Sequence, residues 1–288
     1  RRRRFDVAIA FSGHARDLTY VAHGFVDAQQ KLAWVHGSIA DFFLMSYSFK
    51  NLYLKIRNLC VLSEQNQEKA LRFCDVPQGA LNITKIYNPI DQEPQISDPE
   101  RIAQLREDYG NFLLMVGRFD VDKDQATVLR AQRALREEHG LDPYILFVGD
   151  GPTRASCEAL AEDLGIKDKA VFLGTQRNVD DYYCAAYATI HSSPSEGLPT
   201  VLLESMRCGT PVIATKSLPG VPEILGNDEF GLTCKVSDAD GMASKMADML
   251  RDGSLYERYR AAGRERVKDF SEEHISKELT EILANLQP

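Results

Sequence analysis

Short runs of apolar and β-branched residues alternate along nearly the whole chain with amphipathic stretches of roughly 10–16 residues. This alternation is typical of parallel α/β units, in which each buried strand is followed by a helix that covers the sheet. For the first third of the chain it predicts strands at Asp6–Phe11, Leu32–His36, Asn58–Leu62 and Ile83–Tyr87, and helices at Leu18–Gln30 and Glu64–Phe73, the second capped by Ser63.

The same pattern restarts more regularly at Phe112. The predicted strands are Phe112–Val116, Tyr144–Val148, Ala170–Leu173, Ala188–His191, Pro211–Ala214 and Gly231–Val236, and the predicted helices include Gln125–His139, Arg154–Leu164 and Thr200–Cys208. Beyond Asp238 the sequence is helical to its end, with breaks expected at Gly253 and Ser271.

A polar, proline-containing stretch separates these two series of strands. Asn88-Pro89-Ile90-Asp91 leads into Gln92–Pro99, a composition typical of a linker. We therefore predict a first α/β domain over residues 1–89, a second over residues 90–270, and a C-terminal helix over residues 271–288.

The composition is that of an ordinary soluble globular protein, with 288 residues of which 44% are hydrophobic and 26% are charged. A net charge of −8 argues against a general nucleic-acid-binding protein, which normally carries a basic surplus. The longest apolar runs, such as Phe112–Val116 and Tyr144–Val148, stop far short of the ~20 residues of a membrane span. Six cysteines without a CxxC pair indicate neither a zinc site nor a disulfide framework, and favour a reducing cytoplasm.

The charge divides unevenly between the two predicted domains. Residues 1–87 hold 12 Lys and Arg against 7 Asp and Glu, a net of +5, which leaves −13 for residues 88–288. Two interpretations stay open for the first domain: ordinary solvated charge, or a basic face toward an anionic membrane or a phosphate-bearing acceptor.

The most distinctive sequence is Ser193-Pro194-Ser195-Glu196-Gly197-Leu198-Pro199-Thr200, which follows a predicted strand and opens a helix. A helix start at the carboxyl edge of a sheet presents free backbone N–H groups and a positive dipole end, which bind phosphate without a basic side chain. Glu196 in the loop and Glu204 in the helix are poorly placed for phosphate but well suited to accept hydrogen bonds from sugar hydroxyls.

Seven residues separate Glu196 from Glu204, and this spacing resembles the E-x7-E motif of glycosyltransferase family 4, a retaining family. Further matches follow in chain order: Asn88-Pro89-Ile90-Asp91, Val116-Gly117-Arg118 with Lys123, Val148-Gly149-Asp150-Gly151-Pro152, Phe172-Leu173-Gly174, Gly209-Thr210-Pro211-Val212-Ile213-Ala214 and Gly220-Val221-Pro222-Glu223. The resemblance implies the GT-B fold, an α/β architecture of two Rossmann-like domains with a C-terminal helix that returns to the first.

The resemblance gives the two carboxylates distinct roles. Glu204 would take the ribose hydroxyls of a nucleotide, and Glu196 would meet hydroxyls of the transferred sugar. The other donor contacts that it implies are Gly197, Leu198 and Pro199 near the sugar ring, Thr200 and Val201 near the phosphates, and Arg177 and Asn178 near the base.

Basic residues lie at the first strand–helix turn of the second domain. Arg118 and Lys123, beside Gly117, resemble the family's pair that holds the donor diphosphate, with Arg gripping the phosphate bidentately and Lys adding a point charge. On spacing alone, solvation explains two basic loop residues equally well. Asp120-Val121-Asp122 has the spacing of a metal motif, but Lys123 follows at once and a solvated turn is the better interpretation.

In the first domain, Ala33-Trp34-Val35-His36-Gly37 resembles the strand-end histidine on the acceptor side of the family's cleft; a hydrogen-bonded structural His36 is the alternative. The tract Lys31–Gly37 ahead of Asp41-Phe42-Phe43 resembles enzymes of surface-glycan assembly. The strand and glycine-rich loop that begin the family's first domain have no match before Asp6, and Arg1–Arg4 run directly into a predicted core strand. We therefore expect a first domain truncated at its N-terminus, with donor binding but little sugar transfer.

The resemblance thus predicts a retaining glycosyltransferase, with Glu196, Arg118, Lys123 and His36 as catalytic residues. It would move a sugar from a nucleotide-diphospho-sugar, a UDP-sugar ahead of GDP-mannose, to a glycan or lipid-linked acceptor, with no cofactor or metal. We expect it in the cytoplasm, in peripheral contact with the inner face of an anionic membrane. We do not expect it to bind nucleic acid. Two alternatives remain: a sugar-nucleotide epimerase or phosphorylase on the same scaffold, and a non-catalytic donor-binding fragment or partner subunit.

Overall fold

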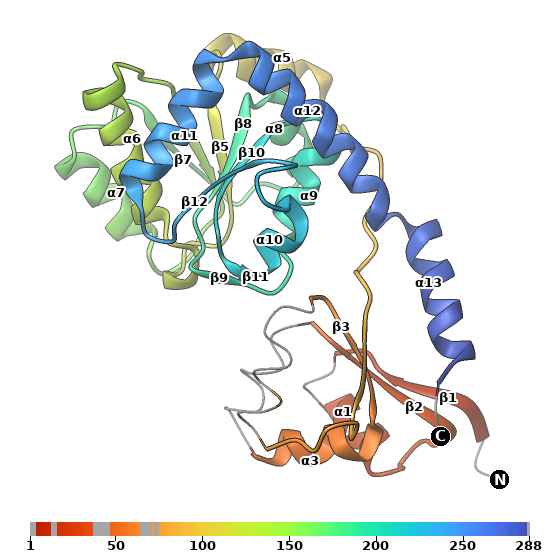
Figure 1. Ribbon diagram of the computed structural model, residues 1–288. Helices are drawn as coiled ribbons and strands as arrows, with labels where there is room; N and C mark the ends of the chain where they lie inside the picture. Colours follow the sequence, from red (N-terminus) through yellow and green to blue (C-terminus); the bar gives the residue numbers. More distant parts are fainter. Residues whose placement is uncertain (1–3, 13–15, 37–46, 64–70, 72–74, 287–288) are drawn as a thin grey trace. The chain divides into compact units, whose positions relative to one another are not determined.

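The computed structural model describes residues 4–12, 16–36, 47–63, 71 and 75–286. The chain divides into two compact units (Figure 1), Arg1–Pro89 with Phe270–Pro288, and Ile90–Asp269. The helix predicted at Glu64–Phe73 falls, Leu71 apart, outside the described residues, as do Gly37 and Asp41-Phe42-Phe43.

The first unit is built on a parallel four-stranded sheet in the order β1-β2-β3-β4. Its elements are β1 (Arg4–Ala10), α1 (Arg16–Ala22), β2 (Asp27–Val35), α3 (Tyr47–Ile56), β3 (Asn58–Val61), β4 (Asn82–Lys85) and α13 (Glu272–Ala284). Helices α1 and α3 cover one face, where Leu18 and Tyr53 pack against Ala8, Ala10 and Val35. Near the end of α13, the Gln30 amide of β2 donates to the Leu286 carbonyl oxygen at 2.9 Å.

One predicted helix of this unit is wrong over part of its length. Helix α1 ends at Ala22, Gly24 adopts a left-handed φ of 72°, and β2 begins at Asp27. Residues 27–30 are therefore strand rather than helix, because they pair in parallel with β1 from the Arg4–Asp27 register onward. Helix α3 was not predicted. On the edge strand β1, Ile9 is 37% exposed and Val7 is half-buried.

The second unit is a parallel six-stranded sheet in the order β12-β10-β8-β5-β6-β7. The strands are β5 (Leu113–Val116), β6 (Ile145–Val148), β7 (Ala170–Gly174), β8 (Ala188–His191), β10 (Val212–Thr215) and β12 (Leu232–Cys234), with a separate pair β9 (Ser195–Glu196) and β11 (Leu218–Pro219). The helices are α5 (Pro99–Tyr109), α6 (Gln125–His139), α7 (Arg154–Asp163), α8 (Val179–Ala185), α9 (Thr200–Arg207), α10 (Gly220–Leu225), α11 (Ala239–Arg251) and α12 (Gly253–Val267), with short 3-10 turns η1 (Val121–Lys123) and η2 (Lys268–Phe270).

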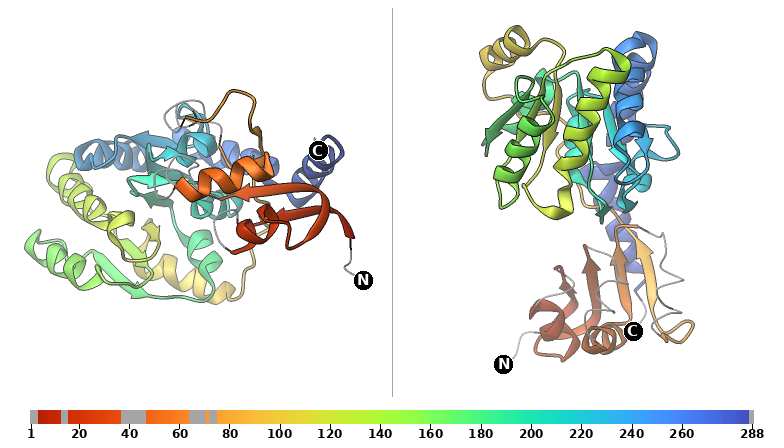
Figure 2. Two further views of the ribbon diagram at one scale, coloured as in Figure 1. Left: turned by 90° about the horizontal axis from the view of Figure 1, so that it is seen from below. Right: turned by 90° about the vertical axis from the view of Figure 1, so that its left-hand side faces the viewer.

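Helices lie on both faces of this sheet (Figures 1 and 2). Side chains of α6, α7, α11 and α12 share one apolar core with β5, β6 and β8, and those of α5 and α8 form a second core on the opposite face. Strands buried on both sides read as continuous apolar runs, which is why every strand predicted here is present within a few residues. The α/β prediction, with two parallel sheets, is confirmed.

The chain changes direction across the sheet between β5 and β8. It runs outward from β5 through β6 to β7, and then returns to β8 and continues outward through β10 to β12. In open α/β sheets, ligands bind at the carboxyl ends of the strands beside such a switch point. The fold therefore favours the ends of β5 and β8 as a binding site.

The polar stretch predicted as a linker is held onto the second unit over most of its length. The Gln95 N–H donates to Asp180 at 2.7 Å, and Ser97 donates to Asp181 from its N–H at 2.9 Å and its hydroxyl at 2.6 Å.

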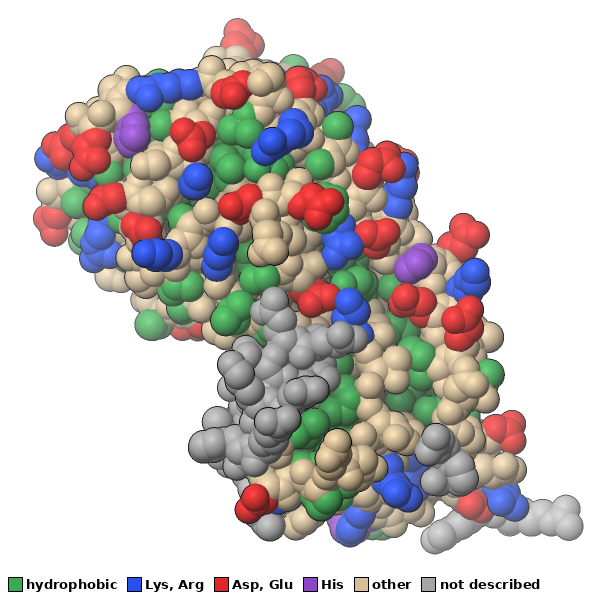
Figure 3. Space-filling view, viewed as in Figure 1, with side chains coloured by type: hydrophobic (Ala, Val, Ile, Leu, Met, Phe, Trp, Pro, Cys, Tyr) green, Lys and Arg blue, Asp and Glu red, His purple; other side chains and the backbone are tan. Residues whose placement is uncertain are grey.

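On the face of this unit seen in Figure 3, acidic and basic side chains are interspersed. Within the described ranges, no helix is both long and apolar enough to cross a membrane.

Candidate functional site

The carboxyl ends of β5 and β8 bring together two groups that lie 73 residues apart in the chain. After β5 the chain passes Gly117 and reaches Lys123, and after β8 it reaches Glu196; the Lys123 Nζ atom lies 2.5 Å from the Glu196 Oε1 atom. The Ser192 hydroxyl, at the end of β8, donates to the Lys123 carbonyl oxygen at 2.8 Å. The two turns are thus joined by a hydrogen bond from a side chain to the backbone as well as by the ion pair.

Helix α9 begins just after the Glu196 turn, and no side-chain hydrogen bond from its cap residue satisfies its first N–H groups. Pro199 occupies the cap position and makes no side-chain hydrogen bond, and Thr200 is exposed. Uncapped N–H groups and the helix dipole favour an anion at this point.

The loop before α9 is positioned by a second, tightly packed segment. Strands β9 and β11 pair in parallel with Pro219 opposite Glu196. A Cβ atom on Gly220 would lie 2.5 Å from the Gly197 carbonyl oxygen, so only glycine allows the two turns to approach this closely. The Thr215 hydroxyl donates to the Ser193 carbonyl oxygen at 2.8 Å. Glu196 therefore lies on a supported turn.

Arg118, on the turn after β5, has an exposed side chain. Its side chain is 64% exposed and lies 2.9 Å from an Asp120 carboxylate oxygen and 3.9 Å from one of Asp122. The carboxylates of the Asp120-Val121-Asp122 turn therefore face Arg118. Within the part of the chain that the structure describes, no group of three His, Cys, Asp or Glu side chains is placed to hold a metal ion.

The glycines of the Val148–Pro152 motif allow the backbone to pass very close to the turn after β5. Gly149 has a φ of 139°, and a Cβ atom there would lie 2.0 Å from the Gly117 carbonyl oxygen. Gly151 makes a similar close approach to the Phe119 carbonyl oxygen, at 2.3 Å. The turn of residues 117–119 packs directly against these two glycines. They therefore help to position Gly117 and Arg118.

Glu204 lies on α9 beside a buried tyrosine that sequence reasoning missed. The Tyr183 hydroxyl donates to the Glu204 Oε2 atom at 3.1 Å, and Tyr183 is fully buried. Burial, with the neighbouring Glu204 charge, holds the pKa of Tyr183 well above its ordinary value, so the tyrosine stays a donor. Arg177 and Asn178 are exposed at the start of α8. Of the other predicted contacts, Gly197, Leu198 and Val201 are half-buried and Pro199 is buried.

His191 is a second residue that the sequence analysis did not single out. It ends β8, is 3% exposed, and its Nε2 atom lies 3.5 Å from Glu196 Oε1. Burial lowers the pKa of His191 to about 4 against the nearby Glu196 charge, which raises it, so the ring is neutral. The signal that could have found it is the position itself, a histidine at the carboxyl end of a predicted strand.

Because His191 is neutral when folded, it makes stability depend on pH. Below its unfolded pKa of 6.5, the unfolded chain binds a proton at this position that the folded chain does not, so stability falls as the pH drops from 6.5 toward 4. We expect wild type to lose about 2 kcal/mol more than His191→Gln between pH 7 and pH 5. Urea unfolding at both pH values measures this difference; equal losses in the two proteins would contradict the assignment.

In the first unit, both ring nitrogens of His36 have protein partners. The Nε2 atom lies 2.6 Å from the Phe11 carbonyl oxygen, and the Nδ1 atom lies 3.0 Å from the Asn88 amide nitrogen. The Trp34 ring lies parallel to the imidazole, with 6.1 Å between the two ring centroids. His36 thus ties the end of β2 to the Asn88-Pro89 segment, and its role toward a substrate stays a prediction.

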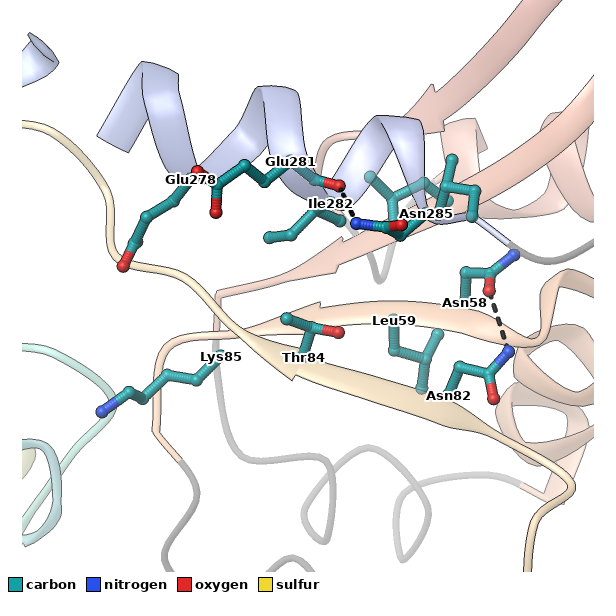
Figure 4. Close-up of a pocket in the computed structure, with 11 residues that line it drawn as sticks. Asn58, Leu59, Asn82, Thr84, Lys85, Glu278, Glu281, Ile282 and Asn285 are labelled. Carbon is teal, nitrogen blue, oxygen red and sulfur yellow. Dashed lines mark hydrogen bonds between the residues drawn. The ribbon is translucent and has the colours of Figure 1, made fainter. Parts of the chain in front are cut away.

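A cavity of about 470 Å³ lies in the first unit between α13 and strands β2 to β4. Figure 4 shows polar side chains of Asn58, Asn82, Thr84 and Lys85 from the sheet, with Glu278 and Glu281 from the helix above them. The Asn82 amide donates to the Asn58 amide oxygen at 3.1 Å. None of the residues that the sequence predicted for a site lines this cavity.

Comparison with known proteins gives a consistent family. Residues 97–266 match the family of glycosyl transferases group 1. The chain is 31% identical over 200 residues to an N-acetyl-alpha-D-glucosaminyl L-malate synthase of Bacillus anthracis, which covers 67% of this chain and 51% of that protein. It is 28% identical over 246 residues to the N-acetylgalactosamine-N,N'-diacetylbacillosaminyl-diphospho-undecaprenol 4-alpha-N-acetylgalactosaminyltransferase of Campylobacter jejuni, covering 85% of this chain and 64% of that protein. The chain thus spans between about half and two thirds of these relatives.

Solved structures share the fold. Anabaena HepE in complex with UDP and glucose superimposes with a TM-score of 0.80 at 19% identity, covering 97% of this chain and 78% of HepE. A glycosyltransferase from Rickettsia africae superimposes with a TM-score of 0.79 at 20% identity, covering 96% of this chain and 76% of that one.

Proposed function

Because the chain belongs to the glycosyl transferases group 1 family, we propose that it acts in retaining sugar transfer from a nucleotide-diphospho-sugar, and that its donor site lies at the carboxyl ends of β5 and β8. A UDP-sugar is the preferred donor in this proposal. Support comes from the fold, which it shares with HepE, solved with UDP and glucose.

One observation supports the assignment of the donor site: the Lys123 Nζ atom lies 2.5 Å from the Glu196 Oε1 atom. A cation suits a phosphate, and a carboxylate suits sugar hydroxyls. In a nucleotide-diphospho-sugar the last phosphate and the sugar share one bond, so the groups that recognise them must lie within a few ångströms of each other. In the free chain the two groups neutralise each other; a bound donor would separate them, with Lys123 turning to the phosphate and Glu196 to the sugar.

The diphosphate would lie between basic side chains and the start of α9. In this proposal Arg118, Lys123 and the N–H groups at Thr200 and Val201 are the groups assigned to the diphosphate. Negative charge grows on the diphosphate as the bond to the sugar breaks, and preorganised positive groups stabilise it. The departing phosphate would itself take the acceptor's proton, so the reaction needs no second carboxylate. Since these groups supply the positive charge, we expect donor binding without a divalent metal.

The remainder of the donor would follow α9 and the start of α8. Glu204, oriented by the Tyr183 hydroxyl, is assigned to the ribose hydroxyls. Arg177 and Asn178 are assigned to the base, and the backbone of Gly197, Leu198 and Pro199 to the sugar ring.

On the acceptor side, we assign a glycan or lipid-linked acceptor and peripheral contact with an anionic membrane at its cytoplasmic face. The net charge of +5 in residues 1–87 supports contact with an anionic surface. The name of the Campylobacter jejuni relative contains a diphospho-undecaprenol carrier, a lipid. His36 is the residue of the first unit assigned to this side.

Calorimetric titration with UDP and with GDP tests the proposal. We expect one of them, UDP first, to bind the chain, and Arg118→Ala to weaken that binding by about 1.5–3 kcal/mol, the range for a hydrogen bond to a charged group. Arg130→Ala is a matched control, because Arg130 is an exposed arginine on α6. Addition of EDTA is expected to leave the affinity unchanged. Absence of heat from both nucleotides would contradict the proposal, and binding without transfer to any acceptor would favour a donor-binding subunit.

A further inference from the structure

His191 is a buried histidine beside the carboxylate assigned to the transferred sugar. It ends β8, an interior strand of the six-stranded sheet, and lies opposite Ala214 of β10 in the parallel register. The residue is 3% exposed, and its Nε2 atom makes no hydrogen bond with any residue that the structure describes. A buried ring nitrogen without a partner is unfavourable unless another state of the protein supplies one.

An acceptor lies at the outer limit of hydrogen-bonding distance from this nitrogen. The Nε2 atom is 3.5 Å from the Oε1 atom of Glu196, and the Lys123 Nζ atom is 2.5 Å from the same oxygen. His191 is buried, and Glu196 and Lys123 are half-buried, so water has little access to this group of side chains. In the free chain Lys123 therefore holds the carboxylate oxygen that His191 faces.

His191 faces this oxygen as a neutral ring. Burial lowers the pKa of His191, the Glu196 charge raises it and the Lys123 charge lowers it, with a result of about 4. A neutral imidazole has one N–H group and one acceptor nitrogen, whereas an ionised carboxylate only accepts. The tautomer with the proton on Nε2 is therefore the one that suits the position beside Glu196.

We propose that His191 is a positioning residue for the sugar: when the donor draws Lys123 onto its phosphate, the Nε2–H group of His191 donates to the Glu196 Oε1 atom in its place. This inference rests on the proposed function, because it requires a ligand that separates Lys123 from Glu196. The carboxylate then keeps a donor on Oε1 and presents Oε2 to the sugar hydroxyls. Because the ring is neutral, Glu196 keeps the negative charge that makes it a strong acceptor.

The Lys123→Met variant tests this exchange without any donor. Removal of the ammonium group frees Oε1, so we expect His191 to donate to Glu196 in the unliganded variant. Heteronuclear NMR of the histidine rings reports the tautomer and the hydrogen bond, and the His191 signal is assigned by its loss in His191→Gln. We expect the proton on Nε2 in wild type, and a downfield shift of that proton in Lys123→Met.

A second substitution shows whether the shift comes from Glu196. The downfield shift should disappear when Glu196→Ala is added to Lys123→Met. A proton on Nδ1 alone in Lys123→Met, or a shift that survives Glu196→Ala, would overturn the proposal. These spectra also decide the matter if a leucine at position 191 prevents folding.

Titration separates positioning of the sugar from a general effect on the site. His191→Leu fills the position without a donor, whereas the His191→Gln amide can reach the place of Nε2. We expect His191→Leu to bind UDP as wild type does. It should bind UDP-glucose or UDP-N-acetylglucosamine, whichever wild type prefers, about tenfold more weakly, the loss of one hydrogen bond to a charged group. His191→Gln should recover most of this loss, and His139→Leu, at the far end of α6, is the matched control.

The loss should act through Glu196. In a Glu196→Ala background, His191→Leu should cause no further loss of UDP-sugar affinity. Equal losses of UDP and UDP-sugar affinity, the same loss in both backgrounds, or no recovery in His191→Gln would overturn the role of His191. Failure of wild type to bind either UDP or GDP would instead contradict the proposed donor site, and is distinguished from the other outcomes because it precedes any substitution.

Discussion

Glu196→Ala is expected to spare the binding of a nucleoside diphosphate while weakening that of the complete donor, and Glu204→Ala to weaken both. The reason is that Glu196 is assigned to the sugar, which only the complete donor carries, whereas Glu204 is assigned to the ribose, which both ligands carry. Each lost hydrogen bond to a carboxylate should cost about 1.5–3 kcal/mol, a factor of roughly 10–150 in affinity. Titration of both variants with UDP and with the UDP-sugar measures how much affinity each variant loses for each ligand.

The ion pair in the free chain sharpens this expectation. Lys123 is held by Glu196 at 2.5 Å, so Glu196→Ala releases Lys123 for the phosphate. We therefore expect UDP to bind this variant as well as wild type or more tightly. Glu196→Gln, which keeps the shape without the charge, is the matched variant. Equal losses for both ligands in both alanine variants would show that the two carboxylates are misassigned.

Glu204→Ala carries a second effect, on stability. It leaves the hydroxyl of the fully buried Tyr183 without the carboxylate to which it donates, and an unpaired buried hydroxyl costs about 1–3 kcal/mol. Adding Tyr183→Phe removes that hydroxyl, so the double variant should regain most of the stability and none of the nucleotide affinity. Chemical unfolding and titration of the same three proteins separate the two effects; affinity that returns with stability would mean that Glu204 acts only on the fold.

Gly149→Ala is expected to destabilise the second unit and to abolish nucleotide binding. The new Cβ atom would lie 2.0 Å from the Gly117 carbonyl oxygen, and the φ of 139° is unfavourable for alanine. Overpacking and backbone strain each cost about 1–3 kcal/mol, and here both apply. The turn that carries Gly117 and Arg118 must move to relieve the contact. Thermal unfolding, with calorimetry on the protein that remains folded, measures both effects.

Gly140→Ala is the matched control for that variant. Gly140 also has a positive φ, of 64°, but a Cβ atom there meets nothing within 4 Å. It should therefore cost only the conformational strain, about 1 kcal/mol, and leave nucleotide binding intact. Similar stability losses in the two variants would show that the Gly149–Gly117 contact is unimportant.

The sequence alone determined most of the second unit. Its parallel strands are buried on both faces, so each is a continuous apolar run, and Ala188–His191 and Gln125–His139 have the predicted bounds. The turns after β5 and β8 could also be located, because each is marked by a short motif of consecutive residues. These motifs are Gly117-Arg118 and residues Ser193–Thr200. Local signals of this kind need no knowledge of distant neighbours.

Tertiary structure decided the rest, because it depends on residues that are remote in the chain. Residues 27–30 became strand through pairing with β1, although their own sequence suits a helix. The partners of the two carboxylates, Tyr183 for Glu204 and His191 with Lys123 for Glu196, follow from strand order and helix packing. A sequence pattern shows which side chains could carry a charge or a hydrogen bond; only packing fixes which of them come into contact and which are shielded from water.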